Sequence, residues 1–182
     1  MYYFNENNDA KRNMLRKEYD YEENYSEYEK EDKKVICPTI IKCGNVGSSV
    51  VIPAGSTAVN TFALASLNLN LHKLCNPVAK LEFTSNFAIG AFVGTIGVQI
   101  FKQCGVLPAV AVGPVFIFTL PAPGITASNP FTFFVCDEDF CIDKCCIYTA
   151  VATPVGTTAG TLTINNATIS AIATCAHNNC CN

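Results

Sequence analysis

The sequence has no tryptophan, two histidines and two methionines, and it contains neither a glycine-rich phosphate loop nor a GxSxG nucleophile motif. Its most apolar stretch, 83–101, is interrupted by three glycines and by polar residues such as Asn86 and Gln99, which fits a strand and turn better than a membrane-spanning helix. The first residues, MYYFNENNDAKRNMLRKEYDYEE, lack the apolar segment of a secretory signal. We therefore expect a non-enzymatic protein with no cofactor, no membrane span and no signal peptide.

Charge is concentrated at the start of the chain. Residues 1–34 hold seven of the twelve Lys and Arg, ten of the fifteen Asp and Glu and six of the seven tyrosines. So polar a segment cannot bury enough apolar surface to offset its ordering entropy, and we expect a disordered tail over 1–34 followed by one domain over 35–182. The domain holds five positive and five negative side chains and no basic patch, which argues against nucleic acid as a partner.

The domain shows the period-2 pattern of half-buried strands. Leu67, Leu69 and Leu71 alternate with Asn68 and Asn70. Further strands are predicted at 79–83, 94–101, 115–120, 131–136, 147–152, 161–164 and 167–174. The predicted turns are Asn76-Pro77, Gly113-Pro114, Pro121 to Gly124, Asn129-Pro130, Pro154 to Gly156 and Asn165-Asn166.

Eight or nine short strands at this spacing predict an all-β fold, a two-sheet β-sandwich with jelly-roll-like order. The edge strands of such a sandwich pair with other chains unless charges or prolines protect them. Because the domain has few charges, we expect the sheets of neighbouring subunits to associate.

Cysteine is the abundant reactive residue. All eleven cysteines lie in the domain and are candidates for disulfides or cross-links: Cys37, Cys43, Cys75, Cys104, Cys136, Cys141, Cys145, Cys146, Cys175, Cys180 and Cys181. An odd number leaves at least one thiol for a bond between chains. If Cys145 and Cys146 enter a strand, they point to opposite faces, so that one lies inside and the other stays accessible. The pair Cys180-Cys181, beyond the last predicted strand, is a natural site for cross-linking.

A metal site is the alternative use of these thiols. The spacing of Cys136, Cys141, Cys145 and Cys146 fits zinc loosely, and it would make the protein a zinc-binding or redox module of a reducing cytosol. Four acidic residues in the same region have the chemistry of a weak calcium site but not the spacing of an EF-hand: Asp137, Glu138, Asp139 and Asp143.

Two histidines precede cysteines at the same His-x2-Cys spacing. His72 with Cys75, and His177 with Cys180, have the residue types of a metal-ligand pair or of a base beside a thiol nucleophile. Exposed loop histidines without a chemical role are the simpler interpretation, because His72 follows the leucine alternation and His177 lies in a polar terminus.

Several blocks, in order, resemble a known family. These blocks are ICPTIIKCG, NPVAKLEF, QIFKQCG, FTFFVCDEDFCIDKCCIYTA and NNATISAIAT. Over residues 36–175 the sequence resembles a cysteine-rich clostridial domain family of unknown function, similar in style to the endospore appendage subunits of spore-forming Firmicutes. Those subunits are jelly-roll proteins whose N-terminal connector forms disulfides to neighbouring subunits. The resemblance implies a connector role for Cys37 or Cys43 and acceptor thiols within the domain.

Together these observations favour a self-assembling structural subunit of a spore surface layer or appendage, stabilised by disulfides within and between chains. Its partners would be copies of itself and other spore-surface proteins. Synthesis is expected in the mother-cell cytoplasm, with a final location on the coat, exosporium or appendage. A third alternative is a surface-displayed β-sandwich that binds a ligand, although no aromatic platform for a sugar is recognisable in the domain.

Overall fold

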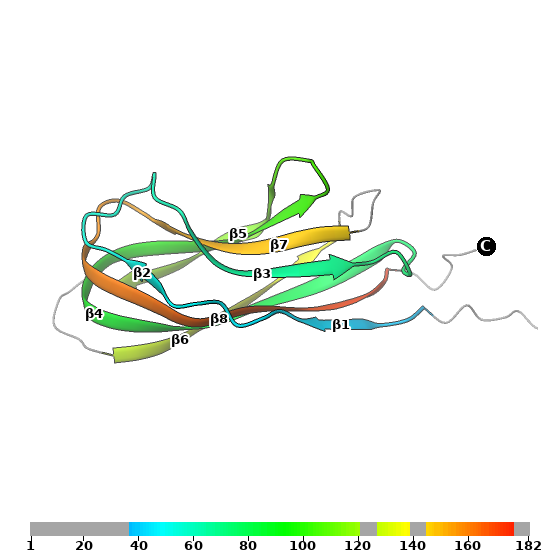
Figure 1. The fold of residues 1–182 in the computed structure, drawn as a ribbon, viewed down its shortest axis with the longest axis horizontal. Helices are drawn as coiled ribbons and strands as arrows, with labels where there is room; N and C mark the ends of the chain where they lie inside the picture. Colours follow the sequence, from blue (N-terminus) through cyan, green and yellow to red (C-terminus); the bar gives the residue numbers. More distant parts are fainter. Residues whose placement is uncertain (1–36, 121–126, 139–144, 177–182) are drawn as a thin grey trace, which may run out of the picture. The chain divides into compact units, whose positions relative to one another are not determined.

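The chain forms β-strands throughout the part that the structure describes. The computed structural model describes residues 37–120, 127–138 and 145–176, which all belong to the compact unit Ile36–Asn182. Eight strands are present (Figure 1): β1 (Ile40–Cys43), β2 (Val50–Ile52), β3 (Phe62–Asn70), β4 (Pro77–Cys104), β5 (Val110–Leu120), β6 (Ala127–Asp137), β7 (Cys145–Pro154) and β8 (Ala159–Cys175). In these residues no helix has the length and hydropathy needed to cross a membrane. The all-β prediction is confirmed, and the tail over 1–34 lies outside the described residues.

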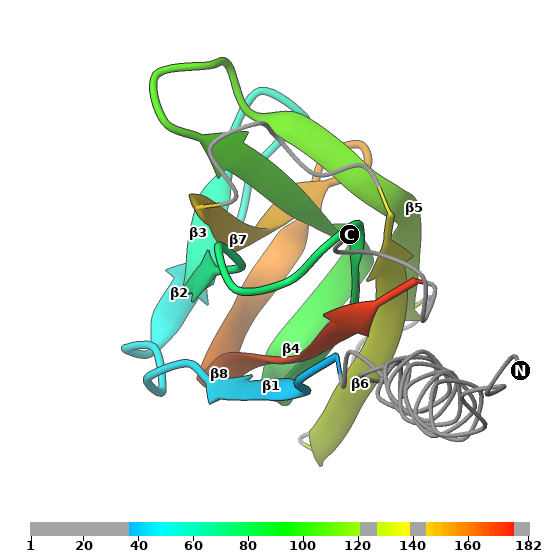
Figure 2. The same cartoon turned by 90° about the vertical axis from the view of Figure 1, so that its right-hand side faces the viewer.

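The strands form two antiparallel sheets that share one strand. Sheet A has the order β1 and β2, then β8, then the first half of β4, then β6. Sheet B has the order β3, β7, the second half of β4, then β5. Figure 2 views the two layers end on, with β1 and β8 in one and β7 and β5 in the other. Because β4 belongs to both layers, all eight strands form one hydrogen-bonded network.

The strand order is that of a jelly roll. Counting β1 with β2 as one strand and the halves of β4 as two, the order is 1-8-3-6 in sheet A and 2-7-4-5 in sheet B. Eight strands in two sheets with such crossing connections define this architecture. The predicted two-sheet, jelly-roll-like sandwich is therefore confirmed.

The longest strand, β4, bends where it passes from sheet A to sheet B. Its pairing with β8 shifts between Gly90 and Val93, and Ala91 has a φ of 54°. Gly160 of β8 lies against this bend, where a Cβ atom would overlap the carbonyl oxygen of Ala91. The sequence predicts separate strands at 79–83 and 94–101. The structure joins them, because residues 86–90 between them also pair with β8.

The inner faces of the sheets form one apolar core. Leu67, Leu69 and Leu71 are at most 2% exposed, as their alternation predicts. Phenylalanine rings from both sheets contact one another in the core: Phe83, Phe87, Phe116, Phe118, Phe131 and Phe133. Each large apolar side chain buried in this way stabilises the fold by about 1.5–3 kcal/mol.

Three predicted turns lie inside strands instead. Gly113-Pro114 lies in β5, Asn129-Pro130 in β6 and Asn165-Asn166 in β8. Because β5 and β6 are edge strands, the N–H that proline lacks is not needed for pairing on the outer side. Gly113 and Asn166 have φ values of 70° and 53° and accompany shifts of register. At these positions turn-forming residues produce bulges and not chain reversals.

Replacing Gly160 with alanine tests the contact at the bend. Gly160 has a φ of 68° and abuts the β4 backbone, whereas Gly55 has a φ of 77° and nothing within 4 Å of its Cβ position. We expect Gly160→Ala to lower the free energy of unfolding by about 1–3 kcal/mol more than Gly55→Ala does, because only the former adds an overlap to the backbone strain. Urea denaturation of both variants measures the difference, and equal losses would contradict the packing of β8 against the bend.

Candidate functional site

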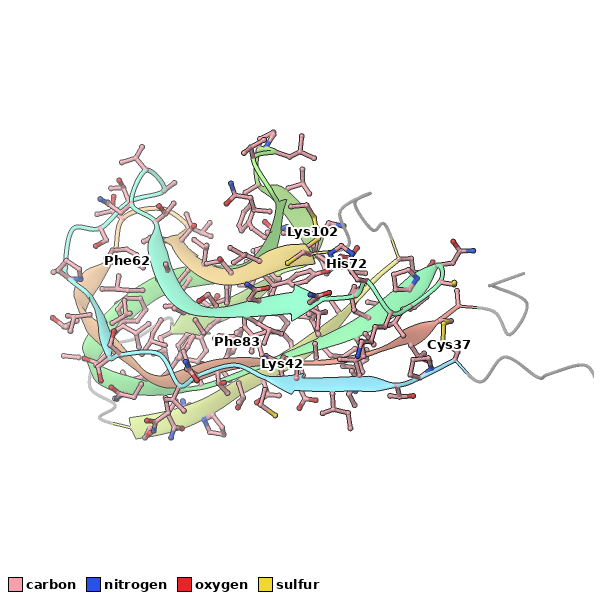
Figure 3. All side chains as sticks on the ribbon, turned by 45° about the vertical axis from the view of Figure 1, so that its right-hand side comes forward. Cys37, Lys42, Phe62, His72, Phe83 and Lys102 are labelled. Carbon is pink, nitrogen blue, oxygen red and sulfur yellow. A yellow bond between two sulfur atoms is a disulfide. The ribbon has the colours of Figure 1, made fainter. Side chains whose placement is uncertain are left out.

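One disulfide joins the two ends of the folded domain. Cys37 precedes β1, Cys175 ends β8, and the bond spans 138 residues of sequence with Cα atoms 5.9 Å apart (Figure 3). The backbone N–H of Cys175 donates a hydrogen bond to Cys37 Sγ at 3.0 Å. Closing so long a loop removes chain entropy from the unfolded state, which stabilises the fold by about 5 kcal/mol.

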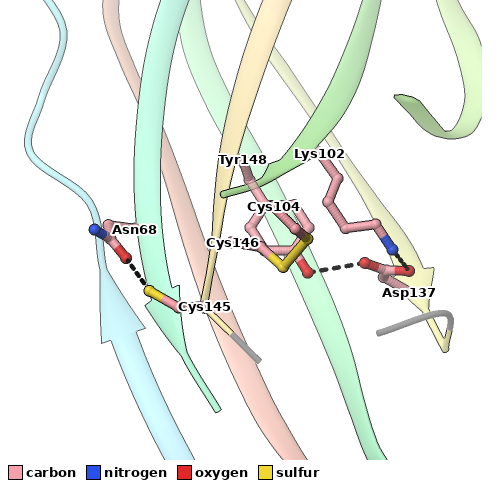
Figure 4. Close-up of a disulfide and its surroundings, with 7 residues drawn as sticks. All are labelled: Asn68, Lys102, Cys104, Asp137, Cys145, Cys146 and Tyr148. Atoms are coloured by element: carbon pink, nitrogen blue, oxygen red, sulfur yellow. Dashed lines mark hydrogen bonds and ion pairs between the residues drawn. A yellow bond between two sulfur atoms is a disulfide. The ribbon is translucent and has the colours of Figure 1, made fainter. Parts of the chain in front are cut away.

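A second disulfide joins neighbouring strands of sheet B. Cys104 of β4 and Cys146 of β7 lie directly opposite each other, with Cα atoms 4.3 Å apart, and both are buried. The adjacent Cys145 points to the other face, where its thiol donates a weak hydrogen bond to Asn68 Oδ1 at 3.6 Å (Figure 4). The predicted division between an interior and an accessible cysteine is what the structure shows.

Three cysteines of the described residues carry unbonded thiols. They are Cys43 and Cys136, which are exposed, and Cys145, which is half-buried. Cys75 is disulfide-bonded. The remaining cysteines of the sequence, Cys141, Cys180 and Cys181, lie outside the described residues.

Cys43 and Cys136 lie on the same outer face of sheet A, at its two opposite edges. Register places them in adjacent rows across the sheet: Cys43, Ser170, Glu82 and Phe134 in one row, and Ile41, Ile172, Lys80 and Cys136 in the next. Three large apolar side chains of these rows are at least half exposed: Ile41 at 70%, Phe134 at 59% and Ile172 at 50%. This face therefore presents a thiol at each edge, with exposed apolar side chains and the charged residues Lys80 and Glu82 in the same rows.

A charged cluster lies buried between the two sheets. Lys102 Nζ on β4 is 3.0 Å from Asp137 Oδ1 on β6, and the two side chains are 6% and 5% exposed. The hydroxyl of the buried Tyr148 on β7 donates to Asp137 Oδ2 at 2.8 Å (Figure 4). Burial, then the charge of Asp137 and the hydrogen bond to it, raises the pKa of Tyr148 far above its ordinary value of 10.0. Tyr148 therefore remains a proton donor at any physiological pH.

The sequence pattern contains a signal for this cluster. Ile96, Val98 and Ile100 are buried, and two residues further along β4 the same alternation places Lys102 on the inner face. On β6, Val135 is buried, so Asp137, two residues later, also lies on the inner face. A lysine and an aspartate at interior positions require partners, because an isolated buried charge is costly. Which strand supplies each partner depends on the topology.

The three described residues of the proposed zinc site do not form a ligand cluster, and the fourth, Cys141, lies outside the described residues. Cys146 is bonded to Cys104, Cys136 lies on the outer face of sheet A, and Cys145 lies on β7 of sheet B. Among the described residues, no three His, Cys, Asp or Glu side chains are grouped so that they could hold a metal ion.

The described members of the other candidate sites are not grouped as metal ligands either. Asp137, from the proposed calcium set, is engaged with Lys102 and Tyr148. Its neighbour Glu138 follows β6, while Asp139 and Asp143 lie outside the described residues. His72 is exposed, and because Cys75 is disulfide-bonded, that pair cannot provide a thiol nucleophile. His177 and Cys180 also lie outside the described part of the chain.

An open hollow of about 330 Å³ lies between the segment joining β1 to β2 and strand β3. Residues 45–48 form one wall, and residues 63–66 with Thr149 form the other. The lining contains no acidic, basic or thiol side chain, so no acid or base lines the hollow beside the hydroxyls of Ser48, Ser66 and Thr149.

Tyr148→Phe tests the cluster through its dependence on pH. Tyrosine in the unfolded chain ionises above about pH 10, whereas the folded state keeps Tyr148 protonated, so the stability that it contributes is present below that pH and is lost above it. We expect the wild type to be more stable than Tyr148→Phe by about 1–3 kcal/mol at about pH 8. The difference in the free energy of unfolding between wild type and Tyr148→Phe should decrease by up to about 1.4 kcal/mol for each pH unit above 10. Urea denaturation with alkylated thiols measures both curves, and parallel curves would contradict the buried donor.

No curated relative matches the sequence. Two solved structures of infectious bursal disease virus are similar to part of the chain: the Gx strain, with a TM-score of 0.42 and 12% identity, and the Gt strain, with a TM-score of 0.29 and 10% identity. Each alignment covers 75% of this chain, but only 38% and 40% of the viral chains, and likeness at this level says nothing about function. Residues 37–174 match the family described as Domain of unknown function (DUF4489), and the chain belongs to that family.

Proposed function

We propose that this protein is a non-enzymatic structural subunit that joins copies of itself through sheet edges and is then locked by disulfides between chains. The observation that carries the proposal is the position of two unbonded, exposed cysteines, Cys43 and Cys136, on opposite edge strands of one sheet face. A subunit with a thiol at each edge can be linked on both sides. Two such sides allow a polymer to grow.

The strand directions favour a head-to-tail contact between β1 of one copy and β6 of the next. β1 is antiparallel to β8, β8 to β4 and β4 to β6, so β1 and β6 run in opposite directions. A copy translated along sheet A therefore sets its β6 antiparallel to the neighbouring β1. The sheet continues across the contact and repeats after four strands, or about 19 Å at about 4.8 Å per strand. A head-to-tail contact that does not close into a ring produces a filament.

Cross-strand geometry suits a disulfide between Cys43 and Cys136 of adjacent copies. Cys104 and Cys146 already form such a bond between opposed residues of antiparallel strands within the chain. A register that sets Cys43 opposite Cys136 reproduces this geometry at the contact. Edge pairing alone is weak here, because β1 has four residues and β6 contains Pro130. Oxidation therefore makes a weak contact persistent.

A bacterial spore surface is the location that the sequence resemblance supports. There a layer assembled from reduced subunits meets an oxidising environment once the mother cell opens, and the disulfides then form. The partners in this proposal are other copies of the chain and other spore-surface proteins. Cys145, half-buried on sheet B, offers an additional position for attachment.

Gel electrophoresis of air-oxidised protein tests the linkage. After free thiols are blocked and the sample is boiled in detergent, we expect wild type to give a ladder of oligomers that collapses to monomer with reductant. Cys43→Ser and Cys136→Ser should each lose the ladder, because each keeps only one partner of the bond. An equimolar mixture of the two variants should give a dimer and nothing larger.

Cys145→Ser is the matched control, because it removes an unbonded thiol from the other sheet, and it should keep the ladder. Monomer in both wild-type lanes would contradict cross-linking altogether. A ladder that survives in the Cys43→Ser, Cys136→Ser double variant would show that other cysteines make the bond.

A further inference from the structure

The ion pair between Lys102 and Asp137 crosses the interior of the sandwich. It lies at the end opposite the bend of β4. Lys102 lies in the sheet B half of β4, whereas Asp137 ends β6 and pairs with Ala79 in the sheet A half. The bend of β4 connects the sheets at the other end of the sandwich, near Gly90. The contact between Nζ and Oδ1 therefore connects the two sheets through side chains, at the end away from the bend of β4.

The ion pair is shielded from water. Both side chains are about one-twentieth exposed, and Ala79, Cys104, Cys146 and Tyr148 nearby are fully or almost fully buried. Removing an ammonium and a carboxylate from water is costly, so such a site favours a reaction that consumes both charges. Nζ lies 3.0 Å from Oδ1, and Asp137 Cγ, the carbon that an amine at Nζ would attack, is one bond beyond Oδ1.

We propose that the side chains of Lys102 and Asp137 condense to form an amide (isopeptide) bond between Nζ and Cγ. One proton passes from Nζ to Oδ1, the resulting amine attacks Cγ, and the Nζ–Cγ bond forms. Oδ1 takes a second proton from Nζ, the Cγ–Oδ1 bond breaks, and water leaves. The ammonium gives up two protons, both of which depart in the water, and nothing is oxidised or reduced.

Tyr148 is placed to assist this reaction. Its hydroxyl donates to Oδ2, the oxygen that carries negative charge in the tetrahedral intermediate and becomes the carbonyl oxygen of the amide. Oδ1, the oxygen that must leave, is the one that faces Nζ. Its raised pKa keeps the tyrosine protonated throughout. Fixed reacting groups in one folded chain reach effective concentrations of about 10⁵–10⁸ M, which replaces an external activating reagent.

The bond would add a covalent cross-link between the sheets, independently of the proposed assembly through sheet edges. Unlike the disulfides, it survives reduction. Each of the two disulfides described above joins elements of one sheet, whereas this bond would attach β6 of sheet A to the sheet B half of β4.

Intact mass spectrometry of the full chain, reduced and alkylated, tests the proposal. We expect wild type to weigh less than its sequence requires by the mass of one water molecule. Tryptic digestion should leave the bond after Lys102 uncut and yield a branched peptide that contains both Lys102 and Asp137. Tyr148→Phe should show a smaller bonded fraction than wild type after the same incubation.

Lys102→Arg and Asp137→Ala should each have the full mass, whereas Lys80→Arg, on the exposed face of the same strand, should keep the loss of water. The wild-type measurement does not depend on whether the variants fold. Full mass in wild type overturns the proposal. A loss of water that persists in Lys102→Arg, or that maps to other residues, overturns it as well.

Discussion

The passage of one strand through both sheets is the constraint on which the rest of the structure depends. The first half of β4 lies between β8 and β6 in sheet A, and the second half lies between β7 and β5 in sheet B. β4 is thus an inner strand of each layer, and its bend against Gly160 determines how the layers approach each other. Because the strand doubles back, residues near its two ends, Ala79 and Lys102, lie at the same end of the sandwich. The buried cluster can form there only because of this course.

The face on which each side chain lies determines its chemistry. Inside, Cys104 and Cys146 meet across two strands and form a disulfide that is shielded from solvent. Outside, Cys43 and Cys136 remain unbonded and exposed at the sheet edges. Buried cysteines therefore form disulfides within the chain, whereas exposed cysteines are accessible to neighbouring chains. A shift of one residue in strand register would move a cysteine from one face of the sheet to the other and so exchange these roles. The bulges in β3, β5 and β8 matter for this reason, since each changes the register locally.

Alternation of side chains made the fold class and most strands predictable, as the burial of Leu67, Leu69 and Leu71 illustrates. The short strands β1 and β2 were not predicted, because runs of four and three residues carry too little pattern and are ordered by pairing with β8. Turn residues at Gly113-Pro114 misled the assignment, since local chemistry does not distinguish a bulge on an edge strand from a chain reversal. The partners of Cys37 and Lys102 could not be predicted, because 138 residues separate Cys37 from Cys175 and only the topology sets Lys102 against Asp137.

The disulfide between Cys37 and Cys175 also changes how the domain responds to a pulling force. Tension applied to the chain before Cys37 and after Cys175 passes through the sulfur–sulfur bond and bypasses the residues between them. The sandwich is then a side loop of the load path, and stretching cannot unravel β4 or expose the core while the bond holds. If the bond were reduced, the tension would pass through the chain between Cys37 and Cys175, which are 138 positions apart in the sequence. The domain would then change from a stiff link to an extensible one. The redox state of this one disulfide thus determines how far a subunit can extend under tension.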